Sequence, residues 1–271
     1  MDLRSIHPGH AIERVRVQTV FTEPLPSKVL ARCSEPLIAV ATSLGFNEVS
    51  QADSNVLNIH VAPTGQSKPL QKGQNGWSFR RKIDQALTEE LALRDGVFGY
   101  VSTQYDRWAD MRSRLQQVFE PAVAAALDVS DATALKLEYW DSFVFDGDRI
   151  GADASDLLSA RPALVPDSAY SGPDNWHSHF GWFEWVKDNR LLINQNFDAV
   201  DLHREGEEVD QKALNIYTLT EHRFESWKLD ASNLIETIDL LHERSLQIFA
   251  RSITPELREV IGIDEQGKVS E

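Results

Sequence analysis

The stretch LALRDGVFGYVSTQYDRWADMRSRLQQVFEPAVAAAL, residues 91–127, indicates most directly how this chain folds. Two apolar segments, residues 91–94 and 97–104, flank Asp95-Gly96, a pair whose backbone favours the positive φ angles of a tight type I′ turn. From Trp108 onward, apolar side chains recur three and four positions apart, as in a helix that covers a sheet with one face. Pro121 removes one hydrogen bond within that helix. The stretch therefore predicts a β-hairpin followed by a long, kinked helix.

The residues before the hairpin predict three more strands and one more helix. Residues 14–21 alternate between apolar and polar side chains, as a half-buried strand does. Residues 27–44 have helical spacing; we expect Pro36 to divide this helix and Gly45 to supply its left-handed cap. Residues 55–61 and 77–83 have strand composition. In the latter, Arg80 and Lys82 share one face, which we interpret as a solvated, charged face rather than a nucleotide clamp.

The same order of elements recurs in the second half. A strand is expected at 135–145, a short helix at 153–160, strands at 177–185, 191–202 and 214–220, and a last long helix from an N-cap at Ser232. Thr254-Pro255 should then start a short terminal helix. We predict an α+β protein of two similar β-α-β-β-β-α halves, residues 1–130 and 131–271, each an antiparallel sheet with helices packed on one face. The halves form two domains, or one compact domain in which they pair their sheets or helices about a pseudo-two-fold axis and leave a cleft or a broad surface between them.

Composition limits the partners of the chain. Acidic residues number 42 against 27 basic ones, for a formal net charge of -15, which opposes non-specific binding to nucleic acids. The sequence has neither an apolar signal segment nor a stretch of apolar residues long enough for a membrane span, so we expect a cytoplasmic protein without membrane contact. The single cysteine, Cys33, cannot form an internal disulfide and is expected to be a buried apolar group.

The segment WHSHFGWFEW, residues 176–185, is the strongest candidate for chemistry. On a strand, His177 and His179 project from the same face, where they could ligate a metal with a carboxylate from Asp141, Asp146 or Asp201. The tryptophans favour instead an aromatic core or the wall of a ligand pocket, with the histidines at a polar edge of the sheet. We prefer the aromatic interpretation. The candidate ligand-binding residues are Trp176, His177, His179, Trp182 and Trp185, and the metal alternative uses His177 and His179.

Other motifs in the sequence are weaker indications of function. Asp146-Gly-Asp148 resembles the start of a calcium loop, but residue 157 is Leu where an EF-hand requires Glu, so a turn is expected. His242 borders the apolar stripe of the last helix and is interpreted as a packed histidine rather than a general base. Dinucleotide, P-loop, nucleophile-elbow and zinc-protease motifs are absent from the sequence, so no cofactor is expected.

Three segments together resemble a known family. They are residues 13–21, the Tyr105-Asp-Arg-Trp108 start of the middle helix, and Leu241-His242 with Phe249 and Ile253-Thr254. In these positions the chain resembles a sporadically distributed family of uncharacterised bacterial and archaeal proteins of about this length. The resemblance implies no catalytic residues, and the scattered occurrence of the family suits an accessory or defence-associated role.

The sequence thus predicts a cytosolic binding or regulatory protein that recognises a partner protein or a small molecule, rather than an enzyme. A homo-oligomer is left open. The alternative function is a metal-dependent hydrolase that uses His177 and His179, and the metal content of the purified protein distinguishes the two.

Overall fold

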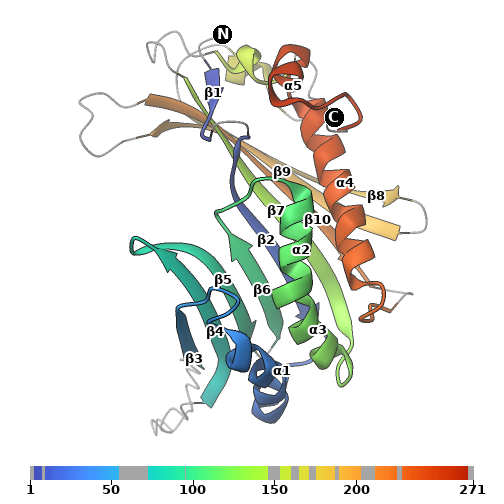
Figure 1. Cartoon of the computed structure of the whole chain (residues 1–271). Coiled ribbons are helices and arrows are strands. Elements are labelled where there is room, and N and C mark those ends of the chain that lie inside the picture. Colours follow the sequence, from blue (N-terminus) through green and yellow to red (C-terminus); the bar gives the residue numbers. More distant parts are fainter. Residues whose placement is uncertain are drawn as a thin grey trace, which may run out of the picture.

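The computed structural model describes residues 3–7, 10–54, 73–94, 96–145, 153–159, 165–170, 175–186, 189–202, 211–224 and 228–267. Its strands join in a single antiparallel sheet of ten strands (Figure 1). The order across the sheet is β3-β4-β5-β6-β2-β7-β10-β9-β8, and β1 pairs with β7 outside this path. The strands are β1 (Leu3–Ser5), β2 (Ile12–Phe21), β3 (Glu48–Ser54), β4 (Gly73–Ile83), β5 (Ala86–Arg94), β6 (Val97–Ser102), β7 (Ala132–Phe145), β8 (Trp176–Val186), β9 (Asn189–Leu202) and β10 (Gln211–Arg223).

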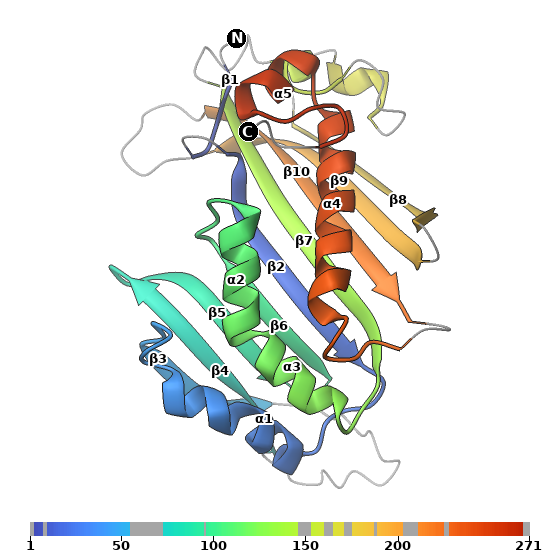
Figure 2. The same cartoon turned by 45° about the vertical axis from the view of Figure 1, so that its right-hand side comes forward.

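The long helices cover one face of this sheet (Figure 2). They are α1 (Ser27–Val40), α2 (Trp108–Val118), α3 (Glu120–Leu127) and α4 (Leu234–Ser252), followed by the short helix α5 (Pro255–Ile261). Helices α2 and α4 lie across the centre of the sheet, whereas α1 packs beside α3 over the strands near one edge (Figure 2). The opposite face, here called the open face, is covered by none of the described helices. Among the described residues, no helix combines the length and the apolar character that crossing a bilayer requires.

The α+β class predicted from the sequence is confirmed, and the strands of the two halves join in one continuous sheet. Strands β2 and β7, one from each half, pair side by side, so that Val17 lies opposite Leu137. Both strands alternate apolar and polar residues, and each edge of a strand needs a hydrogen-bonded neighbour. By pairing with each other, β2 and β7 supply that neighbour on one edge of each strand. On one side of this pair the order is β2-β6-β5-β4, and on the other it is β7-β10-β9-β8.

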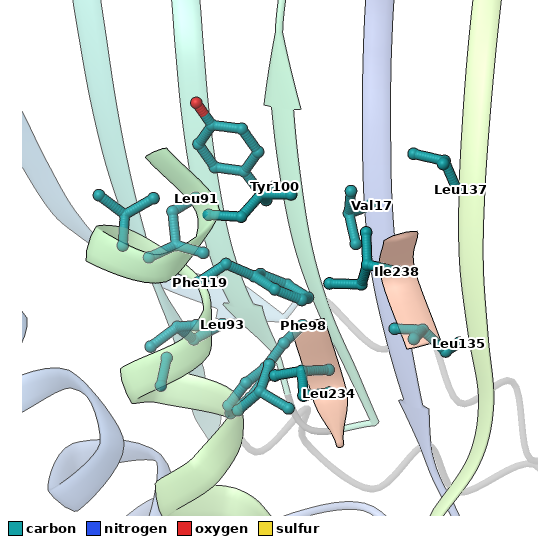
Figure 3. Close-up of a cluster of buried hydrophobic side chains, with 14 of the residues drawn as sticks. Val17, Leu91, Leu93, Phe98, Tyr100, Phe119, Leu135, Leu137, Leu234 and Ile238 are labelled. Carbon is teal, nitrogen blue, oxygen red and sulfur yellow. The ribbon is translucent and has the colours of Figure 1, made fainter. Parts of the chain in front are cut away.

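The core lies between the helices and the centre of the sheet. Phe98 and Tyr100 from β6, Val17 from β2 and Leu137 from β7 are at most 1% exposed. Figure 3 shows these side chains beneath Phe119, Leu234 and Ile238, which come from the helical layer. Alternation along each strand sends every second side chain into this layer, and so the apolar phase of the strands determines which face the helices cover.

The hairpin and the kinked helix are confirmed. Strands β5 and β6 pair from Arg94 opposite Val97, while Asp95 lies outside the described residues. The middle helix is interrupted at Phe119, two residues before Pro121, and continues as α3. This position agrees with the loss of one backbone donor at the proline.

Helix α1 departs from expectation because Pro36 lies inside one continuous helix. Pro36 is exposed, so water can solvate the carbonyl that loses its partner, while Leu30, Cys33 and Leu37 hold the other face against the core. Gly45 has the expected positive φ, 85°, but it follows a turn beyond the helix end. The expected strand at 55–61 lies outside the described residues.

The second half also differs in detail. The expected helix at 153–160 is only a 3-10 turn, Ala154–Asp156, within the described residues of that segment. Helix α4 begins at Leu234, and the expected N-cap at Ser232 is wrong because Asp230 organises the preceding turn, accepting a hydrogen bond from the Ser232 amide at 2.8 Å. The short helix α5 starts as predicted, with the Thr254 hydroxyl accepting a hydrogen bond from the Leu257 amide.

Candidate functional site

A cavity of about 200 Å³ lies between α2 and α4, above the centre of the sheet. Its walls come from the segment that leads into β2, the residues at the start of α2, β7 and β10 below, and α4 with residues after it. We call this cavity the central groove. Its lining is mostly apolar, with a few convergent polar side chains, which is the composition of a small-molecule site.

Strand β7 supplies the polar floor of the central groove. Leu135, Leu137, Tyr139 and Phe143 point toward the helices, and Asp141 occupies the same phase of the strand. Asp141 is 5% exposed, and its carboxyl group has no hydrogen bond or ion pair with another described residue. Burial raises the pKa of Asp141 to about 8, so the carboxyl group is largely protonated at neutral pH.

His242 on α4 forms one wall of the groove. Its imidazole stacks on the indole of Trp108, with ring centroids 4.0 Å apart and an interplanar angle of 11°. Its Nδ1 atom lies 2.9 Å from the hydroxyl of Tyr139. Burial lowers the pKa of His242 to about 4, and therefore the ring is neutral at physiological pH. The interpretation of His242 as a packed histidine is confirmed, and the ring also lines the cavity.

Trp108 is held in place from the outside of the groove. Its Nε1 atom donates a 2.9 Å hydrogen bond to Oδ1 of Asp239 on α4, and Arg112 donates to the same carboxylate. These contacts connect α2 to α4 directly. The position of the indole ring, and thus the width of the groove at this wall, depends on both helices.

Tyr105 and His10 close the end of the groove near the start of β2. The Tyr105 ring meets Tyr139 edge to face, with centroids 6.1 Å apart, and His10 meets Tyr105 in the same way at 5.9 Å. Burial raises the pKa of both tyrosines and lowers that of His10. Together with His242 and the protonated Asp141, these groups leave the interior of the groove without a net charge at neutral pH.

A second, polar cavity of about 400 Å³ lies on the open face, over β2, β7, β9 and β10. At its centre the carboxylate of Glu138 pairs with Arg16 and accepts a 2.7 Å hydrogen bond from the hydroxyl of Tyr217. The guanidinium group of Arg14 lies 3.9 Å from the centroid of the Trp140 ring. The polar side chains here already satisfy one another to a large extent, which favours a structural role for this network.

The candidate residues from the sequence are divided between the two faces by the alternation of β8. His177, His179 and Trp185 lie on the open face, where His177 contacts Asp198 and His179 contacts Asn196. Trp176 and Trp182 lie on the helix face and pack against the core.

The aromatic core expected for this strand is found only on its helix face, where Trp176 and Trp182 pack. Strand β8 is at the edge of the sheet, and Trp185 is 71% exposed. The placement of the histidines at a polar edge is confirmed.

Among the residues that the structure describes, the metal alternative gains no third ligand. Asp141 faces the helices, on the side of the sheet opposite His177 and His179, so its proposed role as their partner is wrong. Asp201 lies against Lys212 and Asn175, and Asp146 falls outside the described residues. Within the described ranges, histidine, cysteine and acidic side chains nowhere gather in threes at metal-binding distance.

The central groove was missed as a site, although the sequence contained a signal for it. Asp141 interrupts the apolar phase of an otherwise regular strand, between Tyr139 and Phe143. A carboxyl group in the buried phase of a strand must be neutral, paired or functional, because burying an unpaired charge is very unfavourable. That inference required knowing that helices cover this phase near Asp141.

Comparison with known proteins gave no match, either to a protein-family model or to a curated protein. The geometry of the site is therefore the basis for a functional assignment.

Proposed function

We propose that this protein is a non-catalytic binding protein whose central groove holds a small, largely apolar ligand. The observation that carries the proposal is a buried carboxyl group without a partner among the described residues, at the floor of a cavity walled by aromatic rings. Ligand pockets typically combine apolar walls with a few polar groups that fix orientation. A residue whose pKa is strongly perturbed within such a cavity is also typical of functional sites.

The architecture supports this proposal. The central groove lies above β7 and β10, between α2 from one half and α4 from the other. Figure 2 shows these two helices over the shared sheet. We further propose that the halves, residues 1–130 and 131–271, arose by duplication, since β2-β6-β5-β4 and β7-β10-β9-β8 run through the chain in corresponding order. A ligand at such a junction could report on the relative position of the two helices.

The family resemblance, which we also retain as a proposal, points to the same place. Tyr105 and Trp108 carry it at the start of α2, and His242 carries it on α4. All three line the central groove. A cytosolic accessory or defence-associated role, in which the bound ligand alters recognition of a partner protein, is consistent with this arrangement.

A groove-filling variant tests the proposal. Leu246 on α4 lines the groove, and Leu246→Trp would fill much of it, whereas Leu87→Trp on β5 makes the same change at a position 45% exposed and outside the groove. We expect native mass spectrometry or a thermal-shift screen of small molecules to find a ligand that binds the wild type and Leu87→Trp but not Leu246→Trp. A ligand that binds all three proteins equally, or a wild type that binds none of a diverse library, would contradict the proposal.

A further inference from the structure

We propose that the central groove selects a small organic cation, an amine whose carbon body is about the size of one aromatic ring, and that the Asp141 carboxylate pairs with its ammonium group. This inference rests on the proposed function and names the class of ligand. The carboxyl group of Asp141 lines the cavity and has no partner among the described residues.

Asp141 has no counter-charge among the described residues. It is 5% exposed, and no described residue forms an ion pair or a hydrogen bond with its carboxyl group. An ionised carboxylate in that position is very unfavourable by itself, while a well-placed ammonium group restores both a charge partner and hydrogen-bond donors. The ligand that gains most from this site is therefore one that carries a positive charge to the floor of the groove.

The described lining of the groove contains no buried cation that would compete with a cationic ligand for Asp141. Arg107 is the one arginine of that lining; its side chain is 72% exposed and is paired with Asp106 and Asp110. His10 and His242 are held neutral by burial, which lowers the pKa of each ring. An anionic ligand would meet a carboxyl group and no buried cation, whereas a cation meets no like charge inside the groove.

Aromatic side chains form much of the wall of the groove. Tyr105, Trp108, Tyr139 and Phe249 bring aromatic rings to the cavity. Aromatic faces attract cations through their quadrupoles and also bury the apolar body of a ligand. The net charge of -15 adds a long-range attraction for cations. Each of these contributions favours the same class of ligand.

The cavity also limits the size of the ligand. It measures about 200 Å³. An engineered apolar cavity of about 150 Å³ accommodates benzene, so the central groove has room for one ring or a short branched chain with an amino group. Polyamines with several separated charges would place their additional ammonium groups among apolar side chains, because the described lining offers one carboxylate besides Asp141, that of Asp106 near the mouth.

The test uses three probes that share a carbon body and differ in charge: 2-phenylethylamine, 2-phenylethanol and phenylacetate. Isothermal titration of each into the full-length protein at pH 8 measures the preference. We expect the amine to bind at least about tenfold more tightly than the alcohol, and phenylacetate to bind most weakly. This comparison uses the wild type alone and does not depend on any variant folding.

Two variants then assign the preference to one residue. Asp141→Asn keeps the shape of the side chain and removes its charge, whereas Glu243→Gln removes one charge from the exposed side of α4 next to His242. We expect the preference for the amine to fall to less than about threefold in Asp141→Asn, because its charge partner is lost, and to persist in Glu243→Gln.

The outcomes separate this inference from the proposed function. If the alcohol or phenylacetate binds as tightly as the amine, the ligand class is wrong. If Asp141→Asn retains the preference for the amine, Asp141 is not the partner of the ammonium group and the inference is overturned. If none of the probes binds but Leu246→Trp abolishes binding of another small molecule, the ligand class is again wrong. If no small molecule binds in the groove at all, both the inference and the proposed function are overturned.

Discussion

The indole ring of Trp108 at the start of α2 lies flat on the imidazole of His242 on α4, with centroids 4.0 Å apart. This contact links the helical layers of the two halves of the chain and forms one wall of the central groove. Because His242 is also hydrogen-bonded to Tyr139 on β7, the stack couples both helices to the sheet. The stability of the helix pair and the shape of the binding cavity therefore depend on the same side chains.

Replacing Trp108 by Ala should destabilise the protein by about 2 to 4 kcal/mol, because the ring loses its stack and its packing, and Asp239 loses the indole donor. Trp185→Ala is the matched control, since that ring is 71% exposed, and should cost less than about 0.5 kcal/mol. Urea unfolding measures both. Equal effects of the two substitutions would show that the stack contributes little to stability.

Asp141 should make the stability depend on pH in a direction opposite to the usual carboxylate. Its pKa is about 8 in the folded protein, against about 3.9 in an unfolded chain, so between these values the folded state holds a proton that the unfolded state has released. The contribution of Asp141 to the free energy of unfolding is therefore fully present below about pH 4 and is lost as the pH rises toward 8.

The other titratable groups facing Asp141 define the pH window. His242, with a pKa of about 4, and His10, whose pKa is also lowered, act in the opposite direction, but only below the ordinary histidine value of about 6.5. The pKa values of Tyr105 and Tyr139 are raised above the ordinary tyrosine range. The window for Asp141 is consequently about pH 6.5 to 8.

Across that window, Asp141→Asn should gain about 1 to 2 kcal/mol of stability relative to the wild type, because an amide has no proton to lose. Urea unfolding at pH 6.5 and at pH 8 provides the comparison. Parallel changes in the wild type and the variant would mean that Asp141 titrates normally in the folded protein.

The histidines of β8 should be dispensable for folding. Their side chains lie on the open face at the sheet edge, so replacing His177 and His179 together by Gln should change stability by less than about 0.5 kcal/mol. Trp182→Ala on the same strand should cost about 1 to 2 kcal/mol, since that ring packs partly against the core. One equivalent of zinc, manganese or iron in the wild type, lost in the double histidine variant, would instead support the hydrolase alternative.

On the open face, the network around Glu138 should be structural. Glu138 is 3% exposed and accepts hydrogen bonds from Arg16 and Tyr217, so Glu138→Gln should cost about 1 to 3 kcal/mol. Glu90→Gln, at a carboxylate 23% exposed and paired with Arg80, should cost less than about 1 kcal/mol. If thermal unfolding shows no difference between the two variants, the open-face cavity is a better candidate for a ligand site than this structure indicates.

The sequence predicted the strands and helices well wherever one face was buried. The alternation in β2 and β7 and the helical stripe after Trp108 arise from local periodicity, which a single sequence contains. Pro36 was misjudged because the cost of a proline in a helix depends on whether the carbonyl it leaves unpaired is exposed to water.

The arrangement of these elements was harder to predict. That β2 pairs with β7 to make one sheet depends on contacts far apart in the sequence, and so does the position of β8 at its edge, where Trp185 is left exposed. The role proposed for Asp141 depends on that arrangement, because the same residue on an uncovered face would be an ordinary surface carboxylate.

A crystal structure of the protein with bound 2-phenylethylamine would show whether Asp141 pairs with a cation in the central groove. We expect the ring to lie between α2 and α4, against Trp108 and His242, with the ammonium nitrogen about 2.7 to 2.9 Å from a carboxylate oxygen of Asp141. Density for the amine in the open-face cavity beside Trp140, with the central groove unchanged, would contradict it.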